Sequence, residues 1–180
     1  MLDLADTART FDDALSWACA ACGGRLTTPQ RIAAAMNRRA KLRYRNALRL
    51  ALDDITAGAH TILEHRYLHD VERPHGLPRA ERQVRVVRGG RSQYRDALYR
   101  KYLVVVETDG RVAHPAEGRW RDVHRDNAAA AVGITTLRYS WSDVTTRPCA
   151  VAAEVGAALA QRGWPGPLRP CGPGCTLPCS

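Results

Sequence analysis

The apolar run at residues 103–106, Leu-Val-Val-Val, constrains the fold more than any other segment of the chain. β-branched residues favour strands, and this run has the character of a buried strand that ends on the carboxylates Glu107 and Asp109. Two further segments with a strand-like pattern precede this run, and Gly89-Gly90 is expected to form the turn between them. Segments with a helical pattern follow the run. We therefore predict an α/β fold, a mixed sheet flanked by helices, with strands at residues 82–88, 94–99, 103–106 and 134–139 and helices at residues 120–132 and 147–161.

The first 60 residues are expected to form helices that carry a basic segment. Gly23 and Gly24 end one helix, and Thr28 followed by Pro29 starts the next. Eight cations and no carboxylate occupy positions 25–49, on one helix or on two with a break near Ala40. This segment suits a phosphate backbone, and a solvated outer face on a packed helix is the alternative. Its candidate DNA-binding residues are Arg31, Arg38, Arg39, Lys41 and Arg45.

Composition divides the chain into three segments. These are a helical basic N-terminal segment at residues 1–60, an α/β core at residues 61–163 and an irregular Pro/Gly/Cys tail at residues 164–180. The net charge of +9 favours anionic partners such as nucleic acid. No run approaches the ~20 apolar residues of a membrane span, and the acidic first twenty residues differ from a signal peptide. We expect a cytoplasmic protein with no membrane partner.

Carboxylates stand where buried strands are expected. Side chains alternate along a strand, so Asp96 shares a face with Leu98, and Glu107 shares one with Asp109. Two adjacent strands would bring these acids together, and a divalent cation neutralises such a cluster. Glu64 lies on a partly apolar helix face and follows the same logic. Salt bridges are the alternative for any single acid, with Arg95, Arg111, Arg121 or Arg125 as the partner.

The acidic motifs belong to a longer ordered series. It runs through Leu63-Glu64, Tyr94-Arg95-Asp96, Val104-Val105-Val106-Glu107-Thr108-Asp109-Gly110, His114, Arg125-Asp126, Gly133-Ile134-Thr135-Thr136-Leu137-Arg138-Tyr139 and Trp141. Over residues 61–161 this series resembles the very-short-patch-repair-like branch of the PD-(D/E)xK nucleases. The resemblance implies a restriction-endonuclease-like core, a Mg²⁺ or Mn²⁺ cofactor and hydrolysis of phosphodiester bonds in DNA.

The resemblance also implies roles for individual residues. Asp96 would be the principal metal ligand, with Glu107 or the main-chain carbonyl of Thr108 as the second. His114 would take the proton of the attacking water, because an imidazole titrates near neutrality. Glu64 would hold metal-bound water.

One departure from the family pattern keeps two hypotheses open. The wider superfamily has a catalytic lysine two positions after the second acid. In this chain the residue two positions after Glu107 is Asp109, which takes the place of that lysine in the catalytic set. The chain is then either an endonuclease that nicks DNA or a nuclease fold that kept DNA binding and lost catalysis. Under the second hypothesis, the protein would regulate a defence or toxin-antitoxin-like system. Arg125 is expected to meet a phosphate or to pair with Asp126 on a helix surface.

The cysteines carry a further metal hypothesis. Cys19 and Cys22 form a CxxC pair, and Cys171 and Cys175 lie in the tail. Zinc would join these four thiols if the tail folded back onto the first helix. Alternatively, the CxxC thiols act as small hydrophobes and the tail thiols are exposed. Scattered single histidines are expected at the surface, namely His65, His69, His75 and His124.

Overall fold

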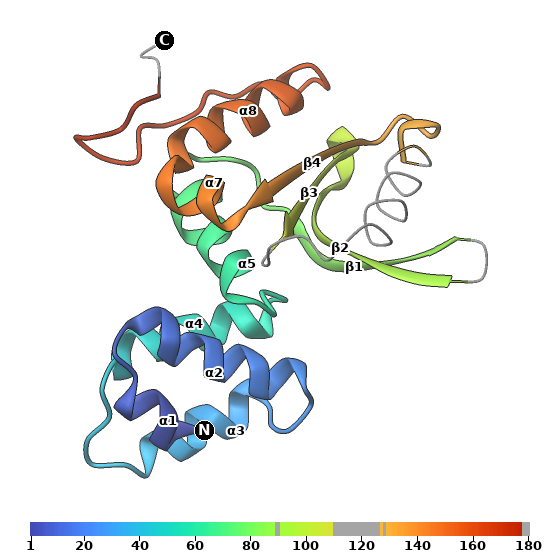
Figure 1. Cartoon of the computed structure of the whole chain (residues 1–180). Helices are drawn as coiled ribbons and strands as arrows, with labels where there is room; N and C mark the ends of the chain where they lie inside the picture. The colour runs from blue at the N-terminus through green and yellow to red at the C-terminus, as the bar shows by residue number, and fades with distance from the viewer. Residues whose placement is uncertain (89–90, 110–126, 128, 178–180) are drawn as a thin grey trace. The chain divides into compact units, whose positions relative to one another are not determined.

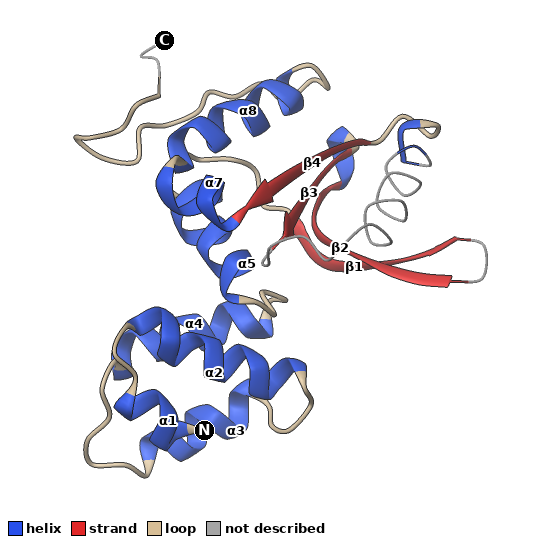
Figure 2. Cartoon of the chain, in the orientation of Figure 1, coloured by secondary structure: helices blue, strands red, loops and turns tan. Residues whose placement is uncertain are grey.

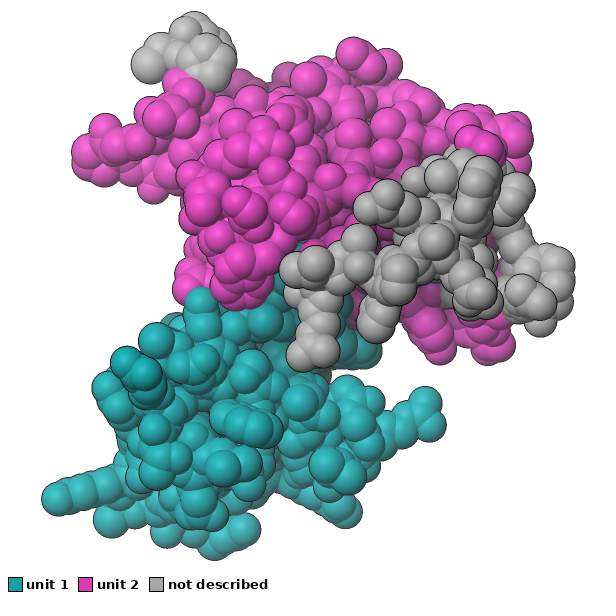
Figure 3. Space-filling view, in the orientation of Figure 1, with its two compact units in different colours: residues 1–65 teal, residues 66–180 magenta. Residues whose placement is uncertain are grey.

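The computed structural model describes residues 1–88, 91–109, 127 and 129–177. These residues form two compact units, Met1–His65 and Arg66–Ser180, which Figure 3 shows in different colours.

The first unit is helical, as predicted. It contains α1 (Leu2–Thr7), α2 (Phe11–Gly23), α3 (Pro29–Asn37) and α4 (Arg45–Thr56), and α5 (Ile62–Arg66) begins at its end (Figure 1). The basic segment therefore lies on two helices, which confirms the alternative with a break near Ala40. Apolar faces of these helices meet in one core, which includes Leu15, Ile32, Met36, Leu48 and Leu52.

Helix caps explain where α2 and α3 begin. The Thr10 hydroxyl accepts a hydrogen bond from the Asp13 amide while the Asp13 carboxylate accepts one from the Thr10 amide, a reciprocal cap at the start of α2. Thr28 accepts from the Arg31 amide and Pro29 takes the first helical position of α3. The predicted start at Thr28 and Pro29 is confirmed, whereas α1 was not predicted.

The second unit is built on a four-stranded mixed sheet in the order β1-β2-β3-β4 (Figure 2). Its strands are β1 (Glu81–Arg88), β2 (Arg91–Tyr99), β3 (Val104–Asp109) and β4 (Thr135–Ser140). β1 and β2 are antiparallel, as are β2 and β3, while β3 and β4 are parallel. Val104, Val105 and Val106 are all buried. The predicted mixed sheet flanked by helices is confirmed.

Helices flank this sheet beside β4. α5 continues into a π-helical segment (Tyr67–Glu72), and α7 (Trp141–Thr146) and α8 (Pro148–Ala160) follow β4. Both α7 and α8 pack against the π-helical segment and against β4 (Figure 1). The helix expected at residues 147–161 is confirmed as α8, whereas α7 and the 3₁₀ turn Arg100–Tyr102 were not predicted.

The helix expected at residues 120–132 lies mostly outside the described residues. Its described C-terminal end has a common helix-ending geometry. The Ile134 amide donates to the Ala129 carbonyl, and Gly133 adopts φ of +76°. Glycine adopts this left-handed conformation without steric cost and commonly ends a helix. Across the described part of the chain, no helix combines the length and hydropathy that a membrane span requires.

Candidate functional site

Asp96 lies on β2, next to the carboxyl end of β3. Its Oδ2 accepts hydrogen bonds from the Thr108 amide at 2.8 Å and from the Thr108 hydroxyl at 3.1 Å. The regular pairing of β2 with β3 reaches only from Tyr99 to Ala97, so the carboxylate replaces a backbone acceptor just beyond it. The structure therefore brings together Asp96 and Thr108, two of the predicted metal-binding residues.

Gln83 on β1 is held in a strained conformation beside Asp96. Its φ is +48°, in the left-handed region, and such a backbone costs a residue with a side chain about 1–3 kcal/mol. Gln83 Nε2 lies 3.5 Å from Asp96 Oδ1, at the outer limit of a hydrogen bond. Backbone strain of this kind clusters at functional sites. Gln83 was not predicted, because nothing in the local sequence pattern marks the distortion.

Glu107 is buried and paired with an arginine. Arg95 Nη1 donates to Glu107 Oε1 at 2.9 Å, and both residues are only 4 % exposed. A buried carboxylate is expensive unless it is neutralised, and here Arg95 supplies the positive charge. For Glu107, the salt-bridge alternative is thus the arrangement that the structure shows.

Asp109 stands at the exposed end of β3. Its Oδ2 lies 3.5 Å from Arg138 Nη1 on the parallel neighbour β4. Within the described residues, Asp96, Glu107 and Asp109 do not gather their oxygens into a three-ligand group. The predicted proton-transfer residue His114 and the predicted phosphate contact Arg125 lie outside the described residues.

Glu64 caps the helix that carries it. Its two carboxylate oxygens accept from the His60 amide at 2.9 Å and from the Thr61 hydroxyl at 3.0 Å, and its own amide donates to Thr61 Oγ1. These local bonds account for a buried acid at the start of α5. Glu64 belongs to the unit Met1–His65 and Asp96 to the other unit, so its predicted role with metal-bound water stays a prediction.

The predicted DNA-binding cations of the first unit divide into two groups. Arg31, Arg38 and Lys41 are exposed. The other two serve the fold: Arg39 pairs with Asp3, and Arg45 donates to the Met36 and Arg39 carbonyls at 2.6 and 2.7 Å, at the end of α3. Helix C-termini leave carbonyls without partners, and Arg45 satisfies two of them.

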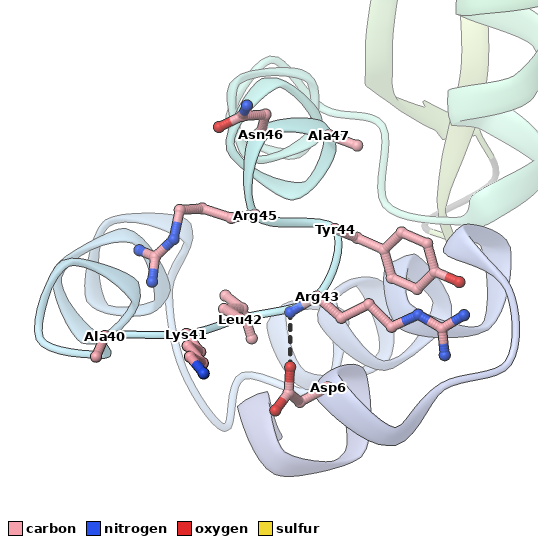
Figure 4. Close-up of a pocket in the computed structure, with 9 residues that line it drawn as sticks. All are labelled: Asp6, Ala40, Lys41, Leu42, Arg43, Tyr44, Arg45, Asn46 and Ala47. Carbon is pink, nitrogen blue, oxygen red and sulfur yellow. Dashed lines mark hydrogen bonds between the residues drawn. The ribbon is translucent and has the colours of Figure 1, made fainter.

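A pocket of about 660 Å³ lies beside the loop between α3 and α4 (Figure 4). Asp6 Oδ1 accepts from the Arg43 amide at 2.6 Å, and Tyr44 begins α4 with φ of +58°. The Arg43 guanidinium lies 4.9 Å from the centre of the Tyr44 ring. The pocket lining is dominated by the basic loop, with residues Asp6, Ala40, Lys41, Leu42, Arg43, Tyr44, Arg45, Asn46 and Ala47.

The tail thiols lie with two residues that the zinc hypothesis did not include. One ligand atom from each of His75, Cys149, Cys171 and Cys175 lies within 4.8 Å of the others. The expectation of a surface position is wrong for His75, which is fully buried, and also for His65. His75 and Cys149 were missed because contacts between distant segments leave no local signal. The CxxxC spacing of the tail was the only available clue.

The described thiols differ in pKa, and the difference does not follow the two units, because desolvation also raises the pKa of the Cys171 thiol in the second unit to about 11. Cys19 lies in the apolar core of the first unit, and burial raises the pKa of its thiol to about 12. Burial also raises the pKa of the Cys22 thiol. In contrast, a hydrogen bond from the backbone of Thr176 lowers the pKa of the Cys149 thiol to about 6. Metals bind the thiolate, so Cys149 is better suited than Cys19 to ligate one. The predicted zinc role of Cys19 and Cys22 stays a prediction.

A buried polar network lies where α5 continues toward the sheet. The Tyr99 hydroxyl donates to Glu72 Oε2 at 2.9 Å and lies 2.9 Å from the Tyr67 hydroxyl. Arg82 Nη2 lies 2.6 Å from the same Glu72 oxygen. Burial raises the pKa of Glu72 and the pKa of Tyr67. The hydrogen bonds between Glu72, Tyr99 and Tyr67, together with the ion pair of Arg82 with Glu72, fix the π-helical segment against β1 and β2.

Comparison of the chain with protein-family models, with curated proteins and with solved structures finds no match. The function is therefore inferred from the residues and contacts described above.

Proposed function

We propose that this protein is a metal-dependent endonuclease-like protein that hydrolyses phosphodiester bonds in DNA, nicking one strand, on a restriction-endonuclease-like core. The observation that carries the proposal is the contact between Asp96 on β2 and Thr108 on β3. It places a carboxylate beside a main-chain segment at the end of a buried strand. The element order, three antiparallel strands followed by a parallel fourth, supports the proposed core.

The donor set suits a hard cation. Asp96 and Glu107 offer carboxylate oxygens and Thr108 a carbonyl oxygen, the ligand type that Mg²⁺ and Mn²⁺ prefer. Bound there, such an ion would polarise a phosphoryl oxygen and lower the pKa of a coordinated water. The Thr108 amide and hydroxyl orient one oxygen of Asp96, and strained Gln83 lies beside the other. Arg95 fixes Glu107.

Charge supports an anionic substrate. The unit Arg66–Ser180 has 18 basic and 11 acidic residues, and the unit Met1–His65 has nine basic and seven acidic residues. Exposed Arg31, Arg38 and Lys41 are available for phosphates. Contacts of this kind supply affinity that falls steeply with salt.

A second candidate function rests on a specific observation. Arg95 already neutralises Glu107, and Asp109, which lies near Arg138, occupies the position of the superfamily's lysine. A site whose acids are paired with arginines has less need of a cation. The second candidate is therefore a DNA-binding protein that does not cleave, with a regulatory role in a defence or toxin-antitoxin-like system.

Plasmid nicking separates the two candidates. Supercoiled plasmid is incubated with the protein in Mg²⁺, in Mn²⁺ and in chelator, alongside Asp96→Asn. The matched control is Asp53→Asn, since Asp53 is an exposed carboxylate on α4. We expect metal-dependent nicking that Asp96→Asn reduces by about 100-fold or more and Asp53→Asn leaves unchanged.

Two results would contradict the endonuclease proposal. Nicking that is equal in wild type and Asp96→Asn would come from a contaminating enzyme. Absence of nicking in both metals, with a salt-sensitive gel shift that persists in chelator, would establish the binding-only candidate.

A further inference from the structure

Four metal-ligating side chains converge in the second unit, independently of the proposed nuclease site. Cys149 Sγ lies 3.7 Å from Cys171 Sγ and 3.8 Å from Cys175 Sγ. The ligand atoms of all three cysteines and of His75 lie within 4.8 Å of one another. All three cysteines are free thiols, and their sulfur separations are far longer than the roughly 2 Å of a disulfide bond.

The imidazole of His75 is oriented for coordination. Nδ1 lies 2.9 Å from the Val71 carbonyl, and a carbonyl only accepts, so Nδ1 carries the proton. Nε2 is then left with a lone pair, and this buried atom meets no hydrogen-bond partner among the described residues. A histidine that donates one ring N–H to a carbonyl and presents the other nitrogen is the usual arrangement of a metal-ligating imidazole. A bound cation would satisfy this otherwise costly buried atom.

Specific contacts bring the tail to this position. The Arg169 amide donates to the His75 carbonyl at 2.8 Å, and Leu168 packs so closely on α8 that a Cβ on Gly156 would lie 2.8 Å from its Cδ1. Beyond these contacts the chain turns, with the Cys175 amide donating to the Gly172 carbonyl at 3.0 Å. Cys171 and Cys175 thus flank one turn, opposite Cys149 in the first turn of α8.

The spacing of these atoms matches one class of metal. Zinc binds thiolates at about 2.3 Å, so two thiolates on a tetrahedral zinc lie about 3.8 Å apart. Three sulfurs and one imidazole nitrogen form a Cys₃His set, which is typical of structural zinc and unlike the oxygen ligands of Mg²⁺. Four protein ligands fill a tetrahedral site and leave no position for substrate.

We propose that His75, Cys149, Cys171 and Cys175 bind one zinc ion that fastens the C-terminal tail to the start of α8 and to the segment that precedes β1. The ion joins three segments that are distant in the sequence. Its role is structural, because its coordination is closed. The three thiols release their protons on binding, so affinity rises with pH.

Metal analysis of the full chain tests the proposal. The protein is purified with zinc supplied and without chelator, and zinc is measured per chain for wild type, Cys149→Ser, Cys171→Ser and Cys175→Ser. Cys19→Ser and Cys22→Ser are the matched controls, as these thiols lie outside the group. We expect one zinc per wild-type chain, at least a tenfold lower content in the three tail-site variants and no change in the controls.

Cobalt substitution and a conservative variant guard against loss of zinc through misfolding. Co²⁺ in place of zinc is expected to show thiolate charge-transfer absorption and the intense visible bands of a tetrahedral site. Cys175→His retains a zinc donor and is expected to keep the metal that Cys175→Ser loses.

Three results would overturn the proposal. The first is wild-type protein that stays zinc-free with zinc supplied. The second is a Cys175→Ser variant with full zinc content. The third is a non-reduced digest in which Cys149 is disulfide-linked to Cys171 or Cys175, because a disulfide removes two of the proposed ligands.

Discussion

At the scale of single residues, the pairing of Arg95 with Glu107 is the most consequential interaction of the proposed nuclease site. Both side chains are almost completely buried and joined at 2.9 Å. Removing one partner of a buried pair leaves an uncompensated charge in a low-dielectric surrounding. The exposed pair of Arg100 with Glu81 is also close, at 2.7 Å, but both groups stay hydrated. Breaking this pair therefore costs little free energy of unfolding.

We therefore expect Arg95→Met to reduce the free energy of unfolding by about 3–5 kcal/mol at neutral pH. The double variant Arg95→Met with Glu107→Gln should recover most of this loss, because no buried charge remains. Urea unfolding measures both. Arg100→Met is the matched control and should cost less than about 1 kcal/mol. Equal losses for Arg95→Met and Arg100→Met would show that Glu107 is neutralised by something other than Arg95.

At the scale of elements, α7 depends on its cap. The Ser140 hydroxyl accepts from the Asp143 amide, and the Asp143 carboxylate accepts from the Ser140 amide at 2.8 Å and from the Ser140 hydroxyl at 2.7 Å. These bonds hold the pKa of Asp143 below its usual value of 3.8. A lowered pKa means that this stabilisation is present at neutral pH and is lost as the pH falls below 3.8.

Ser140→Ala should lower the free energy of unfolding by about 1 kcal/mol at pH 7. The difference from wild type should shrink as the pH falls below 3.8, since protonation of Asp143 weakens the same cap in the wild type. Ser142→Ala, an exposed change on the same helix, is the control and should have little effect. The cap would be unimportant if the two variants had equal urea midpoints at pH 7.

Local patterns explain which elements were predictable. Consecutive valines and the Thr28-Pro29 start are local signals, and the strands and α3 followed them. The turn predicted at Gly89-Gly90 lies outside the described residues. The Ser140 and Asp143 signal of α7 is equally local and was overlooked because the helix is only six residues long. Gln83 and His75 have no local signal. Gln83 adopts a left-handed backbone within β1, and His75 is held by contacts with a tail about 100 residues away in the sequence.

The same distinction applies to the candidate sites: residues marked by the local sequence pattern were predictable, and residues brought together from distant segments were not. Asp96 was predictable because alternation and strand order place its carboxylate next to the strand that ends on Glu107 and Asp109. Thr108 was predicted only through the family resemblance. The partner of Glu107 was open between a metal and an arginine, and only the packed structure identified Arg95. Cys149 and His75 required the path of the tail, which proline- and glycine-rich sequence does not specify.

At the scale of the whole molecule, the distribution of charge identifies which cations can serve nucleic-acid binding. Of the five predicted DNA-binding cations of the basic segment, Arg39 and Arg45 are engaged within the first unit, and Arg31, Arg38 and Lys41 are exposed. Each phosphate contact contributes about 0.9 to the slope of log affinity against log salt concentration. The basic segment is therefore distinguishable from general positive charge by its effect on this slope.

We expect the triple variant Arg31→Ala, Arg38→Ala and Lys41→Ala to lower the salt slope for duplex DNA by about 2–3, in fluorescence anisotropy titrations with chelator present to prevent cleavage. The control triple Arg9→Ala, Arg79→Ala and Lys101→Ala removes the same charge from exposed positions outside the basic segment. Its slope should stay close to that of the wild type. Equal slopes for the two triples would assign binding to the unit Arg66–Ser180, because its excess of seven positive charges would then attract DNA without the basic segment.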